Sequence, residues 1–73
     1  MNVIGKKHNR YTIIGNINNR VALAVNQNAV EPWAVWWLDE QGTPYGGDYF
    51  MDRESALKEF ISRAFSGRAF AVC

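Results

Sequence analysis

A single cysteine, Cys73, excludes an intramolecular disulfide from this chain of 73 residues, and this is the tightest limit on how the chain folds. Domains this short usually need a disulfide, a metal, a partner subunit or an unusual number of large apolar side chains. The composition offers the last of these, because 14% of the residues are aromatic. We therefore expect one domain over residues 1–73 with an aromatic core. The lone thiol also favours a reducing, cytoplasmic location.

The N-terminal segment, residues 1–10, is polar and carries Lys6, Lys7 and Arg10. No apolar stretch follows these bases, and no run in the chain approaches the ~20 apolar residues that span a bilayer. We expect no membrane partner and no signal peptide. Residues 1–10 are predicted to be a flexible basic arm.

The clearest local signal predicts a helix over residues 52–66. Asp52 is a good N-cap residue, and Gly67 suits the left-handed position that follows a helix. The apolar residues of the segment recur at helical spacing and predict one buried stripe: Leu57, Phe60, Ile61, Ala64 and Phe65. Glu59 and Arg63 are spaced as an ion pair on the opposite face, which we expect to be solvated.

Four β-rich runs precede the helix, over residues 11–17, 20–26, 33–38 and 45–50. Asn18 and Asn19 tolerate positive φ angles, so a two-residue turn is predicted to pair Ile17 with Arg20. These signals predict an α+β fold, an antiparallel four-stranded meander over residues 11–50 with one C-terminal helix packed on one face. Residues 68–73 are either a tail or a short edge strand.

The run Trp33–Leu38 is apolar at every position, and alternation divides its side chains between the two faces of the sheet. Gly46 and Gly47 lie in the following run and weaken it as a strand. A glycine opposite a tryptophan leaves room for the indole to lie across the backbone. We expect Trp36 or Trp37 to use that room.

The residue types of an active site are scarce. The one histidine, His8, belongs to the basic segment, and the one thiol is Cys73. A nucleophile and its base need each other within hydrogen-bond reach, and two residues do not supply the three or four ligands of a zinc site. We therefore predict that the chain is not an enzyme and uses no cofactor or metal.

The charges are segregated along the chain. Residues 1–30 contain four bases and no acid, whereas residues 31–52 contain five acids and no base. A polyanion such as nucleic acid is one partner that fits the basic part. The residues that would carry this alternative function are Lys6, Lys7, Arg10 and Arg20.

The apolar residues exceed what one helix covers, because several strands carry bulky side chains on both faces. The excess is either enclosed by twisting of the sheet or exposed as a patch, and exposed aromatic patches mark protein-binding sites. We interpret the chain as a protein-binding module. The partner-binding residues predicted on this basis are Trp33, Trp36, Trp37, Tyr45, Asp48 and Tyr49. A homodimer held by sheet edges or by the uncovered face is a further alternative.

Three segments carry a resemblance to a known class of proteins. They are residues 30–36 with a Pro-Trp-x-x-Trp pattern, residues 46–50 with Gly-x-x-Tyr-Phe, and residues 52–60 at the helix start. In these the chain resembles small accessory proteins of bacterial phages, plasmids and conjugative elements. Some members of that class are anti-CRISPR proteins and other inhibitors of host defence, which act by binding an effector. The resemblance implies an inhibitor that binds a host protein, without naming a target.

Overall fold

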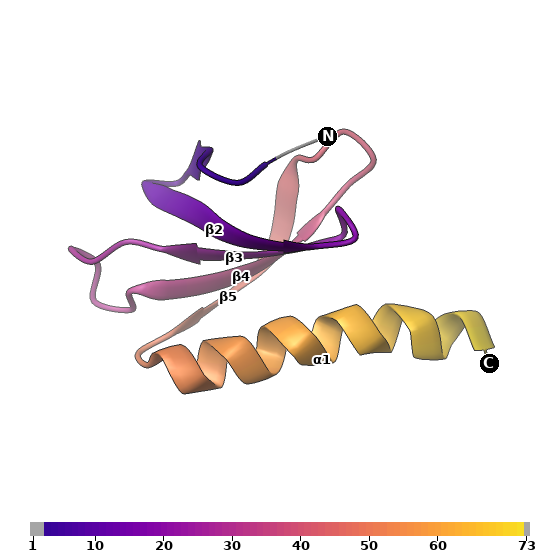
Figure 1. Ribbon diagram of the computed structural model, residues 1–73. Coiled ribbons are helices and arrows are strands. Elements are labelled where there is room, and N and C mark those ends of the chain that lie inside the picture. The colour runs from indigo at the N-terminus through magenta and orange to yellow at the C-terminus, as the bar shows by residue number, and fades with distance from the viewer. Residues whose placement is uncertain (1–2, 73) are drawn as a thin grey trace.

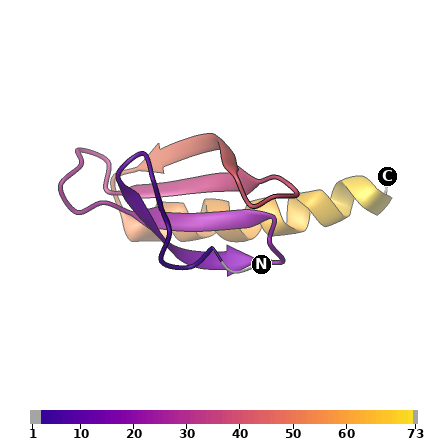
Figure 2. The same ribbon diagram turned by 90° about the horizontal axis from the view of Figure 1, so that it is seen from above.

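The computed structural model describes the backbone of residues 3–72 and the side chains of residues 3–65. The elements in chain order are β1 (Lys7–His8), β2 (Tyr11–Ile17), β3 (Val21–Val25), β4 (Trp33–Leu38), β5 (Pro44–Phe50) and α1 (Arg53–Val72). The strands form one antiparallel sheet in the order β1-β2-β3-β4-β5, and α1 lies along one face (Figures 1 and 2). The predicted α+β meander with a C-terminal helix is confirmed. The predicted strand number is wrong, because β1 adds a fifth strand.

The N-terminal segment is packed against the sheet, which corrects the prediction of a flexible arm. The backbone N–H of Gly5 donates to the carbonyl of Ile13, and the Ile13 N–H donates to the carbonyl of Lys6, at 2.8 Å each. Val3 is only 1% exposed. These hydrogen bonds and this burial hold residues 3–8 in place.

The hairpin between β2 and β3 has the predicted turn residues but a different register. Asn18 and Asn19 adopt φ angles of 54° and 56°, as expected. However, Ile17 pairs with Val21 and not with Arg20, so the loop is one residue longer than predicted. A bulge between Ile13 and Gly15 compensates for the change. It places Ile17 beside the helix while Ile13 stays on the other face.

The sheet has an apolar core on each of its two faces. The cluster on the helix-covered face consists of Val21, Leu23, Val35, Ala56 and Phe60. The cluster on the opposite face consists of Val3, Tyr11, Ile13, Ala22, Ala24, Ala34, Trp36 and Leu38. The alternation predicted for β4 is confirmed, because Val35 faces the helix while its neighbours Ala34 and Trp36 face away.

The start of α1 agrees with the sequence. Asp52 accepts hydrogen bonds from the backbone N–H and the hydroxyl of Ser55, both at 2.9 Å. These bonds stabilise the ionised carboxylate and hold the pKa of Asp52 below its ordinary value. The helix therefore begins where its N-cap predicts.

The rest of α1 departs from the prediction. The helix continues past Gly67 to Val72, so no edge strand forms there, and Cys73 lies outside the described residues. Glycine costs only about 1 kcal/mol inside a helix, and no proline follows to stop it. The buried stripe is also rotated: Ile61 is 48% exposed, whereas Arg63, expected in solvent, is 7% exposed. Within the described residues, no helix is long and apolar enough to cross a membrane.

Candidate functional site

Trp36 is a core residue, although the sequence predicts it as a partner-binding residue. It is 2% exposed, on the face opposite the helix. The rings of His8 and Tyr11 meet its indole edge-to-face, at centroid distances of 5.0 and 5.7 Å. Tyr49 completes the group, with its centroid 6.3 Å from Trp36. An enclosed indole contributes to folding and offers no surface to a partner.

Tyr11 joins this aromatic group to the backbone of the β3–β4 loop. Its hydroxyl donates a 2.7 Å hydrogen bond to the carbonyl of Glu31. Burial, aided by the nearby Tyr49 and Glu31 side chains, raises the pKa of Tyr11 above its ordinary value. Tyr11 follows the basic residues in the chain but is only 8% exposed, so its ring is not accessible for a nucleic-acid base to stack on.

Trp33 and Trp37 lie on the opposite, helix-covered face of β4. Both are half-buried and pack against the cluster that includes Phe60. Trp37 is also held by a cation–π contact, with the guanidinium carbon of Arg63 5.2 Å from the ring centroid. These two tryptophans anchor the helix and keep only part of their rings for contacts with other molecules.

Three aromatic side chains of the described residues remain largely accessible: Phe65 on α1, which is 59% exposed, and two tyrosines on β5. Tyr45 is 54% exposed and Tyr49 is 38% exposed. β5 is last in the strand order, so its outer backbone edge pairs with no strand among the described residues. The structure thus places both tyrosines on one exposed edge strand, but on opposite faces of it, because Tyr45 pairs with Trp37 of the helix-covered face and Tyr49 pairs with Ala34 of the other face.

A bulge shapes the middle of β5. Gly46 and Gly47 together oppose Trp36, because Val35 pairs with Asp48 and Trp37 pairs with Tyr45. A Cβ atom at Gly47 would overlap the Nε1 and Cδ1 atoms of Trp36. At Gly46, where φ is +61°, a Cβ would lie 3.1 Å from Trp37 Cδ1. The expectation that glycines make room for a tryptophan is confirmed for both indoles.

Arg63 holds this bulge from the helix side. Its guanidinium donates to the carbonyl oxygens of Val35 at 3.2 Å and Gly46 at 2.8 Å. It also forms ion pairs with Asp48 at 2.6 Å and Glu59 at 2.8 Å. Asp48 is thereby committed to a structural contact, although its side chain remains 58% exposed. Sequence reasoning missed Arg63, yet its spacing after Ala56 and Phe60 would have placed it on the buried stripe.

Tyr45 lines a hollow of about 480 Å³ at one end of the sheet. The other residues around the hollow are Asn19, Arg20, Leu38, Asp39 and Glu40. Asp39 is occupied, since its Oδ1 accepts from the N–H groups of Gln41 and Thr43 at 2.9 and 2.8 Å. The hollow combines an apolar floor at Leu38 with charged walls of both signs.

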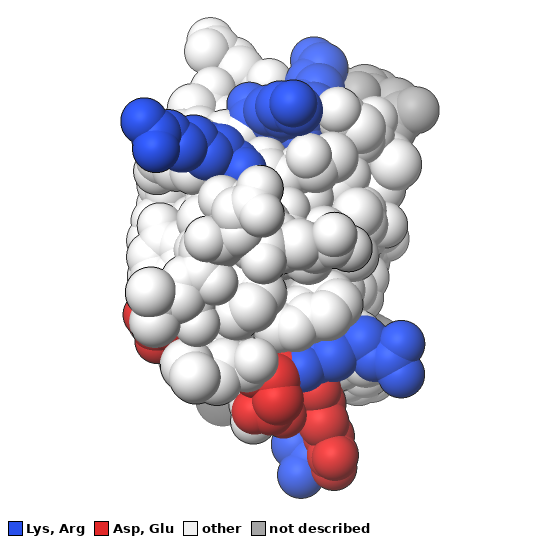
Figure 3. Space-filling view, turned by 90° about the vertical axis from the view of Figure 1, so that its left-hand side faces the viewer, with Lys and Arg blue, Asp and Glu red and all other residues white. Residues whose placement is uncertain are grey.

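The four bases predicted to bind nucleic acid are divided between two ends of the molecule. Lys7 and Arg10 line a second hollow, of about 320 Å³, and Lys6 precedes them in the chain. Arg20 lies in the turn at the far end of β2 and lines the Tyr45 hollow. In Figure 3, Lys and Arg side chains lie both at the top, with no acidic side chain beside them, and at the bottom, where they lie next to the acidic side chains.

The described residues form no cluster of three or more His, Asp, Glu or Cys side chains that could hold a metal. His8 stacks against Trp36, and Cys73 lies outside the described part of the chain, so no nucleophile and base are seen together. The predictions about catalysis and cofactors stay predictions. The described residues instead form exposed surfaces and hollows where another molecule can make contact.

In comparisons with known proteins, no family model, curated protein or solved structure matches the chain. The resemblance to accessory proteins of mobile elements therefore rests on the three sequence segments alone. The features that bear most directly on function are the Tyr45 hollow, the hollow at Lys7 and Arg10, and the exposed β5 edge.

Proposed function

We propose that this chain is a protein-binding module without catalytic activity and that β5 is its binding edge. The observation that carries the proposal is the exposure of Tyr45 and Tyr49 on a seven-residue edge strand. Tyrosine is enriched among the residues that dominate binding energies, because it buries a large ring and keeps a polar tip. Between the two tyrosines, Gly46 and Gly47 carry no side chain to keep a partner's backbone away.

The Tyr45 hollow suggests what kind of partner segment fits. Leu38 forms an apolar floor, so a partner's apolar side chain would be accommodated there. Glu40 lines the same hollow and is exposed, and it favours a segment with Lys or Arg beside the apolar residue, whereas Asp48 is already paired with Arg63. An extended peptide with these features is the partner chemistry that we propose.

The alternative of a homodimer formed edge to edge is less well supported by β5. The strand begins at Pro44, which has no backbone N–H to donate, and its centre is bulged. Proline and bulges are features by which natural sheets avoid pairing with copies of themselves. Sedimentation at several concentrations tests this alternative, and a concentration-dependent dimer would favour it.

The experiment that tests the proposal is site-specific photo-crosslinking in a lysate of the cells in which the protein occurs. A benzophenone side chain replaces Tyr45 in one variant and Tyr49 in another. Val30, which is 85% exposed on the β3–β4 loop, provides the matched control position. We expect the same adduct from both β5 positions and not from Val30. Adducts that are equal at all three positions, or absent from β5, would refute the proposal.

The identified partner then allows a quantitative test. Tyr45→Ala is expected to weaken binding at least about tenfold, as is typical of a truncated interface anchor. Thr43→Ala, at an exposed residue close to Tyr45, should leave affinity within about twofold. Because of the resemblance noted above, a host defence effector is the first candidate to examine as the partner, in an assay of its inhibition.

A further inference from the structure

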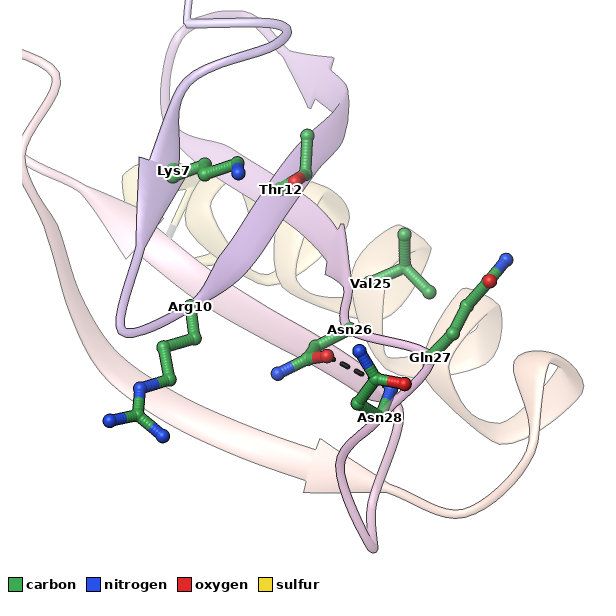
Figure 4. A pocket seen from close by; sticks show the side chains of 7 residues that line it. All are labelled: Lys7, Arg10, Thr12, Val25, Asn26, Gln27 and Asn28. Carbon is green, nitrogen blue, oxygen red and sulfur yellow. Dashed lines mark hydrogen bonds between the residues drawn. The ribbon is translucent and has the colours of Figure 1, made fainter.

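The hollow at the basic end is built from two segments that are far apart in the sequence. The β1–β2 hairpin contributes Lys7, Arg10 and Thr12, and the end of β3 with its following loop contributes Val25, Asn26, Gln27 and Asn28. Figure 4 shows the two groups of side chains on either side of the hollow. Its volume of about 320 Å³ is room for on the order of ten water molecules. A phosphate group with its neighbouring atoms fits such a space.

The cations at this hollow have no acidic partner. Neither Lys7 nor Arg10 forms an ion pair within the described residues, in contrast to Lys58 and Arg63. No acid occurs before residue 31, although Glu31 at the end of the same loop lies near Tyr11 and offsets part of the positive potential at this end. An anion that enters the hollow meets unpaired positive charge.

Uncharged donors beside these cations are fixed in position. The Oδ1 atom of Asn26 accepts a 3.0 Å hydrogen bond from the backbone N–H of Asn28, which directs the Asn26 amide nitrogen away from Asn28 (Figure 4). That nitrogen lies on the side of Arg10 in the same view. The backbone of Asn26 is itself held by its N–H bond to the carbonyl of Pro32, at 2.7 Å. The donor is thus preorganised and keeps both of its N–H groups for another acceptor.

Arg10 occupies a backbone position that suits glycine. The turn His8–Tyr11 has Asn9 and Arg10 at φ angles of 51° and 72°. Turns of this kind favour Asn followed by Gly, and a long side chain at positive φ is strained. Replacing Arg10 with glycine therefore removes the guanidinium without harming the turn, which provides an unusually clean test of the side chain.

We infer that this hollow binds a backbone phosphate of a nucleic acid, with Lys7 and Arg10 as the charged donors and the Asn26 amide as a neutral one. Arginine and lysine with side-chain amides are the usual donors to phosphate oxygens. A membrane surface is less suitable, because stable attraction to anionic lipids takes about four to eight clustered cations. Here Lys6, Lys7 and Arg10 supply three.

The binding is expected to be weak and sensitive to salt. If Lys6, Lys7 and Arg10 together neutralise two or three phosphates of a single strand, the logarithm of the association constant falls with the logarithm of salt concentration at a slope of about −1.4 to −2.1. Fluorescence anisotropy with a labelled oligonucleotide of mixed sequence, as single-stranded RNA, single-stranded DNA and duplex DNA, measures this slope. Vesicles that contain phosphatidylserine and free inorganic phosphate serve as separate probes for the other sources of the same chemistry.

The decisive comparison uses two double variants with equal change in net charge. K7Q/R10G removes both charged donors from the hollow, whereas R53Q/K58Q removes two bases from the exposed side of α1. We expect K7Q/R10G to weaken single-strand binding at least about tenfold and to reduce the salt slope, with the control within about twofold. Thermal unfolding should show that K7Q/R10G remains folded, because glycine suits the turn.

Three results would overturn the inference. They are salt-independent or undetectable binding of the oligonucleotides, equal losses in the two double variants, and binding of the vesicles in preference to nucleic acid. None of these bears on Tyr45, which lines the hollow at the opposite end of the sheet, so Tyr45→Ala and the crosslink at Tyr45 keep the two proposals separate.

Discussion

The two faces of the sheet are both buried, but by different means. Large branched residues of β3 and β4, such as Val21, Leu23 and Val35, fill the helix-covered face and pack directly against α1. Alanines occupy the centre of the open face, the one opposite the helix, and a single indole, Trp36, lies among them. The helix α1 covers one face, and strands near the two edges of the sheet curl over the other.

Ring contacts across the open face show how strongly the sheet curls. In a flat sheet, β2 and β5 would be separated by three strand spacings, about 14 Å. Yet the rings of Tyr11 on β2 and Tyr49 on β5 are 5.4 Å apart. Small side chains at the centre allow the edge strands to approach each other over that face. A chain with one helix can therefore bury both faces of its sheet without a partner.

Because both faces of the sheet are buried within one protomer, a surplus of apolar residues does not by itself imply a partner. Most of the expected surplus is enclosed within one protomer, including Trp36 and Tyr11. The large apolar residues that remain accessible are spread over the chain: Tyr45 and Tyr49 lie on β5, Ile61 and Phe65 on the helix, and Ile4, Ile14, Val30 and Met51 elsewhere. The case for a binding surface thus rests on the two tyrosines of the edge strand and no longer on the tryptophans.

The strongest test of the open face as a true core is Trp36→Ala. Truncating a fully buried large aromatic residue typically costs about 3–5 kcal/mol, which is a large share of the total stability of a chain this short. We expect the urea midpoint to fall sharply, or folding to be lost. Phe60→Ala on the helix-covered face is the matched variant, and a Trp36→Ala cost far below that of Phe60→Ala would show that the open face is loosely packed.

Gly47→Ala probes the same face by filling space. A Cβ at this position would overlap the Trp36 ring, which is enclosed and has little room to move. Overpacking of this kind costs about 1–3 kcal/mol, and we expect the upper half of that range by urea denaturation. Gly5→Ala is a useful comparison, because no atom lies within 4 Å of its added Cβ and only backbone strain from its φ of +90° applies. An unchanged midpoint for Gly47→Ala would contradict the enclosed position of the indole.

Arg63→Met tests how α1 is fixed to the bulge of β5. The variant keeps an unbranched apolar stem but loses the bonds to Val35, Gly46 and Asp48. Hydrogen bonds to charged groups contribute about 1.5–3 kcal/mol, and we expect a loss of about 2 kcal/mol because Asp48 is solvated and recovers water. Lys58→Met is the control, since its pair with Glu54 is 3.8 Å long and exposed. Equal effects of the two changes would show that Arg63 is an ordinary surface cation.

The elements with strong local signals were predictable from the sequence. The Asp52 cap, the alternation in β4 and the Asn18–Asn19 turn all follow from a few neighbouring residues. β1 was missed because two residues are too few to show a period. The curl of the sheet depends on contacts between distant strands, which no local pattern contains.

The candidate site was predicted less well, for related physical reasons. Tyr45 and Tyr49 were expected on an exposed surface and lie on one. Trp36 was misplaced because alternation assigns a face without saying whether that face is enclosed. Arg63 was predicted in solvent because a charged residue on an apolar stripe breaks the usual binary pattern. Its buried position is explained by the carbonyl oxygens of Val35 and Gly46, which accept its hydrogen bonds at the β5 bulge.

The smallest expected effect is a change of folding stability at alkaline pH, which arises from Tyr11 on the open face. Tyr11→Phe removes the hydrogen bond to the Glu31 carbonyl and should cost about 1 kcal/mol at neutral pH. The pKa of Tyr11 is raised in the folded state above its ordinary value of 10.0. The neutral phenol therefore contributes its stability fully below about pH 10 and loses it as the pH rises through the folded pKa.

Wild-type protein should accordingly lose stability faster than Tyr11→Phe as the pH rises above about 10, so that the difference between their urea midpoints narrows or reverses. Phenolate absorbance of the folded protein should include a component with a raised pKa, and Tyr11→Phe should remove it. Tyr45→Phe, at an exposed ring of the β5 edge, is the matched control and should track the wild type. Parallel pH profiles for wild type and Tyr11→Phe would mean that the open face admits water to the Tyr11 hydroxyl, and the two faces would then differ in hydration as well as in covering.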